Sequence, residues 1–402
     1  MRLGILITAI SQILVFLFSF LNGWLIIKVM GSEGKGQIAY LLSFSQIILP
    51  FISLGIRQSV SYFSKLSDEF NESKKSKYIS FSLTLSLIFS TLFYCLLYLF
   101  NFINFKILLL LNVITVFNIF ISIKTIFALS NQKFITLSFA KIAPLLFQSV
   151  VLVVIYYFYS ILTPSVYLLL ISFSLLISIL LIKSERYNFN FRISNYKIIK
   201  PYLLKGISYS IPLTLIFLNY KLDIVLLKFF NINDSKIGVY SLAVNYTEIL
   251  FQIPAILSLV IFSHGLVAEK STYSKKIKII HNRLILILIP SVFLFERLCN
   301  YFIPILYGNE FIESARLLSI LVLSSFFIIS FNILNTHLAS SYGKPMFGFY
   351  PLLLSLIINV LLNCILIPSI GIKGAAISTT ISYSVLGIIY FFQHKKFINE
   401  NL

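Results

Sequence analysis

The sequence predicts an all-α membrane protein of about twelve transmembrane helices in two six-helix lobes. Three observations support this fold class. The 402 residues are 58% hydrophobic and only 11% charged, and their mean hydropathy is +0.95. A soluble chain carries about 25% charged residues. Apolar stretches long enough to span a bilayer recur along the whole chain, and a weak internal repeat relates its two halves.

The apolar stretches define the predicted helices, since a spanning helix needs roughly 20 apolar residues. The first, from Leu3 to Ile27, is longer than the core of a signal peptide, so we expect it to be retained as a helix. The twelve predicted spans are 3–27, 38–63, 79–100, 106–130, 142–160, 164–183, 207–230, 237–263, 282–303, 314–340, 346–368 and 374–393.

The distribution of basic residues predicts the orientation. With the N-terminus in the cytoplasm, 21 of the 32 Lys and Arg residues fall in inside segments and 8 in outside segments. Basic residues are enriched in cytoplasmic loops. We therefore expect a multi-pass membrane protein with both termini in the cytoplasm. The net charge of +19 suits contact with anionic lipid, and we expect no nucleic-acid partner.

Two features predict the lobes, which we place at residues 1–195 and 196–402. The longest connection, the basic stretch from Lys183 to Gly206, divides the chain between spans six and seven. In addition, GQIAY at 36–40 resembles GVYSLA at 238–243, and pairing Gly36 with Gly238 sets Gln46 opposite Glu248. Six spans separate the repeats, so both keep one orientation and would be related by an axis along the membrane normal. Chance similarity between apolar helices is the alternative explanation.

Five charged residues stand out within the predicted spans, since a charge at a helix centre costs about 2.5–3.5 kcal/mol. Asp223 or Glu248 could bind a proton or cation in a water-filled cavity. The alternative is a structural contact between helices, such as a salt bridge from Lys221 to Glu248. Arg57 could bind phosphate through its planar guanidinium or extend to the lipid headgroups. For Lys124, extension to the interface is the simpler explanation.

Motifs of enzymes, cofactor sites and metal sites are missing from the sequence. We therefore expect no enzyme, no cofactor and no metal. The three cysteines show no disulfide or metal spacing. The four histidines are scattered over predicted helix ends and loops, where structural roles are expected: His264, His281, His337 and His394.

Short motifs in a fixed order resemble the Wzx-type polysaccharide (O-antigen or capsule repeat-unit) flippases of the MOP transporter superfamily. They are MGSEGKGQ at 30–37, LGIRQS at 54–59, DIVLL at 223–227, GVYSLA at 238–243, PILYGNEF at 304–311, GKP at 343–345 and PSIGIKGAA at 368–376. No single motif is specific for this family, but their order and spacing over positions 30–376 are much more specific. The resemblance covers most of the chain.

This resemblance implies two lobes around a central cationic cavity. Such proteins lie in the bacterial cytoplasmic (inner) membrane and move undecaprenyl-diphosphate-linked oligosaccharide from its inner to its outer leaflet by alternating access. Arg57, Lys124 and Lys221 would bind the diphosphate, while Asp223 or Glu248 would bind a coupling ion. Membrane lipids, a polysaccharide polymerase and a chain-length regulator are the expected partners. The residues expected to bind the sugars are Gln46, Asn219, Asn245 and Tyr246.

Two other functions remain open. A small-molecule or multidrug exporter of the same superfamily would bind cations and should have mainly acidic cavity residues, whereas both signs occur here. A membrane glycosyltransferase or polysaccharide polymerase usually displays a large outer loop or domain, and the predicted outer connections are short.

Overall fold

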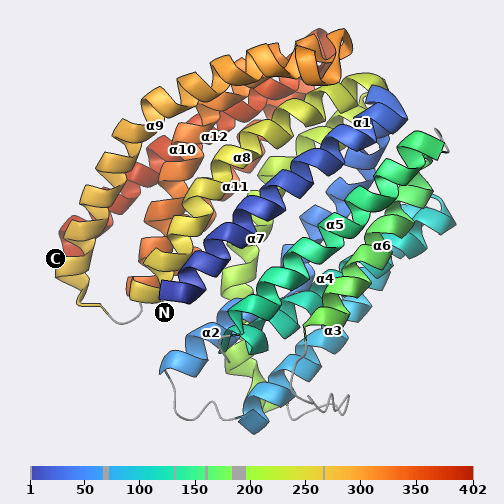
Figure 1. Ribbon diagram of the computed structural model, residues 1–402. Helices are drawn as coiled ribbons and strands as arrows, with labels where there is room; N and C mark the ends of the chain where they lie inside the picture. The colour runs from blue at the N-terminus through green and yellow to red at the C-terminus, as the bar shows by residue number, and fades with distance from the viewer. Residues whose placement is uncertain are drawn as a thin grey trace. The chain divides into compact units, whose positions relative to one another are not determined.

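The computed structural model describes residues 2–66, 72–130, 133–158, 162–182, 196–265 and 268–401, and these ranges are almost entirely helical (Figure 1). This confirms the predicted all-α class. Two short 3-10 helices, η1 (Asn309–Phe311) and η2 (Pro345–Gly348), lie beside α10. The α-helices are α1 (Arg2–Ile52), α2 (Ile56–Leu66), α3 (Glu72–Leu99), α4 (Phe105–Ser130), α5 (Phe134–Phe158), α6 (Pro164–Leu181), α7 (Tyr196–Phe229), α8 (Asp234–Gly265), α9 (Lys270–Tyr307), α10 (Ile312–Ser341), α11 (Phe349–Ile370) and α12 (Ile372–Asn401).

The helices match the twelve predicted spans. Within the described residues, ten stretches are long and apolar enough to cross a membrane. One of these, Ile10–Ser64, covers most of the first predicted span and all of the second. Helix α8 coincides with the predicted span 237–263. Large apolar side chains cover the outside of the helices, with Tyr157 and Phe158 75% and 79% exposed. Such a surface is stable against lipid rather than water.

The first two predicted spans differ from the structure in their connections. Instead of a separate outer loop, α1 continues through this region and breaks only at Gly31, which has φ 67° and ψ −168°. The predicted span 38–63 is not one helix, since α1 ends at Ile52 and α2 begins at Ile56. Leu54 and Gly55 between them have φ values of 49° and 60°. Glycine adopts such left-handed conformations without a steric penalty.

The chain forms two compact units, which we call unit 1 and unit 2. Unit 1 contains Met1–Gly34 and Phe44–Thr214, and unit 2 contains Lys35–Ser43 and Leu215–Leu402. The predicted boundary at residue 195 lies outside the described residues, and the division into lobes at that point stays a prediction.

Each unit has its own core. In unit 1, buried residues from the end of α1 and from α2, α3, α4 and α7 form one cluster that includes Ile52, Tyr78 and Tyr202. In unit 2, α10 packs against α8, α9 and α12, and α12 also packs against α11. This arrangement positions polar side chains of α7, α8, α11 and α12 inside unit 2.

Candidate functional site

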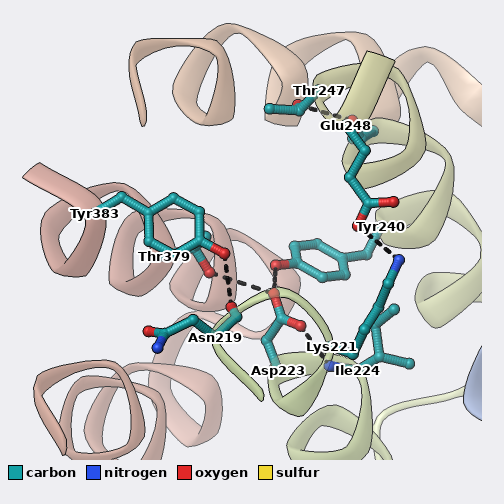
Figure 2. Close-up of polar contacts among 10 residues, drawn as sticks. Asn219, Lys221, Asp223, Ile224, Tyr240, Thr247, Glu248, Thr379 and Tyr383 are labelled. Atoms are coloured by element: carbon teal, nitrogen blue, oxygen red, sulfur yellow. Dashed lines mark hydrogen bonds and ion pairs between the residues drawn. The ribbon is translucent and has the colours of Figure 1, made fainter. Parts of the chain in front are cut away.

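A cluster of buried polar side chains inside unit 2 is the candidate site (Figure 2). It surrounds a cavity of about 10 Å³, close to the minimum that holds one water molecule. Both predicted ion-coupling residues line this cavity, and all of its lining residues belong to α7, α8, α10 or α12. They are Tyr220, Asp223, Val244, Thr247, Glu248, Leu321, Ser324, Thr379 and Tyr383.

Lys221 and Glu248 form an ion pair between α7 and α8. Lys221 Nζ lies 2.6 Å from Glu248 Oε1, and the two side chains are 8% and 25% exposed. Lys35 of α1 is also buried and interacts electrostatically with both residues. The salt bridge that the sequence offered as a structural alternative is therefore present. Because its charge is matched by Glu248, Lys221 is not an isolated cation in this structure.

Asp223 points away from Lys221, into a network of hydroxyl groups (Figure 2). Tyr240 Oη donates a hydrogen bond to Asp223 Oδ2, and Thr379 Oγ1 donates to the same oxygen at 3.3 Å. The backbone N–H of Ile224 donates to Asp223 Oδ1 at 2.8 Å. A buried carboxylate needs such donors to offset the loss of water. The arrangement stabilises a negative charge and leaves oxygen atoms, the ligands that hard cations prefer, close together.

The network continues through Asn219 and the polar face of α11. Tyr383 Oη donates to the Asn219 carbonyl oxygen at 2.8 Å, and Ser355 Oγ donates to Asn219 Oδ1 at 3.1 Å. Asn359 Nδ2 lies 3.5 Å from Thr379 Oγ1, and Asn363 Nδ2 donates to Asn359 Oδ1 at 2.9 Å. Asn219 is thus engaged by its protein neighbours, and its role in binding sugar stays a prediction.

Sequence reasoning missed Tyr240, Thr379 and the asparagines of α11 as parts of this site. Tyr240 belongs to a motif that was recognised as a repeat and as part of the family resemblance but not as part of a site. A lone hydroxyl in an apolar helix carries no distinctive pattern. The spacing of Asn359 and Asn363 on α11 was an available signal, since residues four apart share one face of a helix.

Two other predicted sugar ligands on α8 lie outside the cavity lining. Asn245 is exposed. Tyr246 is half-buried, and its hydroxyl lies 3.2 Å from that of Tyr307 on α9. The structure therefore does not bring these side chains together with Asp223 and Glu248 around the cavity, and their roles stay predictions.

The remaining predicted substrate ligands belong to unit 1. Gln46 is half-buried in α1, and Arg57 is exposed in the first turn of α2. Lys124 of α4 binds the end of α6 instead of extending outward: its Nζ donates to the carbonyl oxygens of Ile179 at 2.6 Å and Ile182 at 3.1 Å. These carbonyls close a helix, where a cation is stabilised by unpaired oxygens and the helix dipole. This geometry supports a structural role for Lys124, and its role in binding the diphosphate stays a prediction.

Comparison with known proteins reveals relatives of two kinds. Over 104 residues, or 26% of this chain, the sequence is 28% identical to an uncharacterized membrane protein, MJ1068, of Methanocaldococcus jannaschii, and the match spans 20% of that relative. Among solved structures, the chain is similar to a multidrug resistance MATE family transporter of the MOP superfamily in an inward-facing conformation. Their identity is 14% and the TM-score is 0.66, with 99% of this chain and 98% of the other covered.

The lipid II flippase MurJ in an inward closed conformation is a further structural relative. It is 18% identical, with a TM-score of 0.59 and coverage of 98% of this chain and 88% of that chain. At such identities the likeness establishes the fold alone, which this chain shares with these two proteins. A family model described as polysaccharide biosynthesis protein matches residues 2–263, well over half of the chain. This protein therefore belongs to the polysaccharide biosynthesis protein family of membrane proteins.

Proposed function

We propose that this protein is a flippase that carries lipid-linked oligosaccharide repeat units from the inner to the outer leaflet of the cytoplasmic membrane by alternating access. The family match over residues 2–263 carries the proposal. The fold shared with a lipid II flippase supports it. The lipid carrier would be undecaprenyl diphosphate, both termini would be cytoplasmic, and a polymerase and a chain-length regulator would be the functional partners.

The chemistry of the cargo explains why such a protein is needed. A diphosphate headgroup with attached sugars cannot enter hydrocarbon without a large desolvation cost, whereas the polyprenyl tail can stay in lipid. Arg57 is our first candidate for the phosphate anchor because its guanidinium keeps its charge and binds phosphate in a bidentate manner. Its exposure at the start of α2 supports this choice.

The polar cluster of unit 2 would couple transport to an ion. A proton or cation that binds Glu248 competes with Lys221 for the same carboxylate, because the ion pair occupies Glu248 Oε1. Lys221 would then be released to interact with the anionic headgroup. Asp223 is the second candidate for ion binding, and its three hydrogen bond donors support a role for it as a charged group.

The experiment that tests the proposal follows the lipid-linked repeat unit across the membrane. We would delete the gene, confirm the loss of surface polysaccharide, and measure in which leaflet the repeat unit accumulates. Accumulation in the cytoplasmic leaflet that is cleared by plasmid-borne protein is the expected result. Unchanged surface polysaccharide, or unpolymerised repeat units in the outer leaflet, would contradict flipping.

Variants of two arginines then test the anchor. Arg57→Ala should leave the repeat unit in the inner leaflet at normal protein abundance. Arg297→Ala is the matched control, because Arg297 is another exposed arginine, 86% accessible and 3.8 Å from Glu296. If the Arg57 variant cleared the repeat unit from the inner leaflet as well as the wild type does, Arg57 would not be the phosphate anchor. The proposed flippase activity itself would still stand.

Export of cationic small molecules is a second candidate function. The cavity lined by Asp223 and Glu248 favours it, since carboxylates attract cations. The pairing of Glu248 with Lys221 reduces the negative charge available and argues against it. Sensitivity of the deletion strain to cationic drugs, with normal surface polysaccharide, is the outcome that would favour export.

A further inference from the structure

Three histidines that are far apart in the sequence lie close together in unit 2, and we call them the histidine cluster. His281 belongs to α9, His337 to α10 and His394 to α12. His337 Nδ1 lies 3.1 Å from His394 Nε2. His281 interacts electrostatically with His394, and its ring stacks on Phe391, one turn earlier on α12. The cluster therefore connects side chains of three helices.

Ser274 of α9 is a hydrogen bond partner of the histidine cluster. Its Oγ is 2.7 Å from the carbonyl oxygen of Lys270, 3.2 Å from His337 Nε2 and 3.3 Å from Tyr342 Oη. A hydroxyl has one proton and a carbonyl can only accept, so when Ser274 donates to Lys270 it accepts from His337 Nε2–H. The bare Nδ1 of neutral His337 then accepts from His394 Nε2–H. In the other tautomer His337 Nδ1–H donates to His394 Nε2, so in both tautomers one N–H···N hydrogen bond joins the two neutral rings.

The contact between His337 and His394 limits how many protons the two rings can bind. One added proton still leaves a bare nitrogen on one ring, so an N–H···N hydrogen bond can persist. A second added proton gives both facing nitrogens a hydrogen and both rings a positive charge. Two donors 3.1 Å apart cannot form a hydrogen bond. Free imidazole changes charge between about pH 5 and about pH 8. Because the second proton is disfavoured in this contact, it would bind only below that range.

The charges around the histidine cluster affect how easily it binds a second proton. Within the described ranges, no carboxylate forms an ion pair with these rings: Glu400 pairs with Lys396 at 3.9 Å, and Glu269 accepts from Ser271 and Thr272. The other charged or titratable neighbours are Tyr273, Tyr342 and Tyr390 beside the rings, Lys270 over Tyr342, Lys344 over Phe397, and the exposed Lys275, Lys276, Lys278 and Lys395.

We propose that the histidine cluster is a proton-binding site that loosens the packing of α12 against α9 and α10 when the pair of His337 and His394 binds its second proton. The same helices reach the candidate site, since α10 contributes Ser324 and α12 contributes Thr379 and Tyr383 to the cavity. Tyr383 and His394 are eleven residues apart, or about 16 Å along the helix. Acidification at one end of unit 2 would thus alter the helices that line the cavity.

Hydrogen–deuterium exchange of the purified full-length protein in lipid nanodiscs tests this site. Exchange is compared at about pH 7.5 and about pH 4, of which the second lies below the range of free imidazole, with labelling times corrected for the intrinsic rate. We expect peptides covering residues 334–342 and 388–397 to exchange faster at the lower pH. His394→Gln should lose this acid response. His264→Gln, which changes an exposed histidine of α8, should keep it.

Two outcomes would overturn the proposal. In the first, exchange of these peptides in the wild-type protein does not respond to pH. This measurement needs no variant, so it does not depend on how well a variant folds. The other is an acid response that survives in both His337→Gln and His394→Gln. Because the readout is helix exchange and not transport, it is independent of the proposed flippase activity.

Discussion

Gly36 of α1 and Gly238 of α8 pack backbone against backbone. A Cβ atom on Gly36 would lie 1.9 Å from the carbonyl oxygen of Asp234 and 2.8 Å from the amide nitrogen of Gly238. These are the two positions that the sequence repeat pairs with each other. Gln37, the next residue, donates to Asp234 Oδ2 at 3.3 Å, and Asp234 also binds Lys228 at 2.6 Å. The two copies of the repeat thus meet at their equivalent glycines, as small residues allow close approach of helices in membranes.

Gly36→Ala is expected to destabilise the protein by about 1–3 kcal/mol, since overpacking forces the backbones apart. Gly23→Ala is the matched control, because both glycines lie in α1 and a Cβ on Gly23 has nothing within 4 Å. The control should be neutral or slightly stabilising, because alanine favours helix. Thermal unfolding in detergent measures both. Equal midpoints for the two variants would show that α1 and α8 do not approach this closely.

The ion pair between Lys221 and Glu248 should behave as a coupled unit. Removal of one partner leaves a buried charge without its counter-ion, which costs about 3–5 kcal/mol. Lys221→Met and Glu248→Gln are each expected to destabilise unit 2. The double variant should lose less unfolding free energy than the two single variants lose together. A double-mutant cycle of unfolding free energies measures this coupling. Strictly additive losses would mean that the two side chains do not interact.

Asp223→Asn should weaken the network at the cavity. The carboxylate accepts from Tyr240, Thr379 and the backbone of Ile224, whereas an amide has one oxygen and would turn an N–H toward a donor. We expect a loss of about 1–3 kcal/mol. Glu313→Gln, at an exposed carboxylate of α10, should change stability little. A variant at Asp223 as stable as the wild type would contradict this hydrogen bonding.

Lys124→Met separates a structural role from a role in substrate binding. The variant loses the hydrogen bonds to Ile179 and Ile182, so its thermal stability should fall by about 1 kcal/mol or more. Transport per folded molecule should stay at the wild-type level. Lys106→Met, at an exposed position of the same helix, should change neither quantity. If Lys124→Met had normal stability but lost transport, the result would support a role for Lys124 in substrate binding.

The sequence was a good guide to the spans and a partial guide to the site. Hydropathy located the helices because lipid imposes long apolar segments. Hydropathy could not reveal the break at Leu54 and Gly55, since a single turn hardly alters the mean hydropathy of a span. The partner of Lys221 could be guessed because charges in spans are rare. The contacts of Tyr240, Thr379 and the histidines could not be guessed from the sequence. Hydroxyl and imidazole groups carry no pattern that identifies their partners, and only tertiary packing decides which of them meet.

The membership of Lys35–Ser43 in unit 2 has a consequence for how the chain can be divided. The chain passes from one unit to the other after Gly34, Ser43 and Thr214, and each passage lies inside a helix, either α1 or α7. Two fragments separated near residue 195 would not be self-contained, because the first would carry a piece of the second one's core. Coexpressed, they should associate by exchanging that piece, and neither should accumulate as a native fold alone.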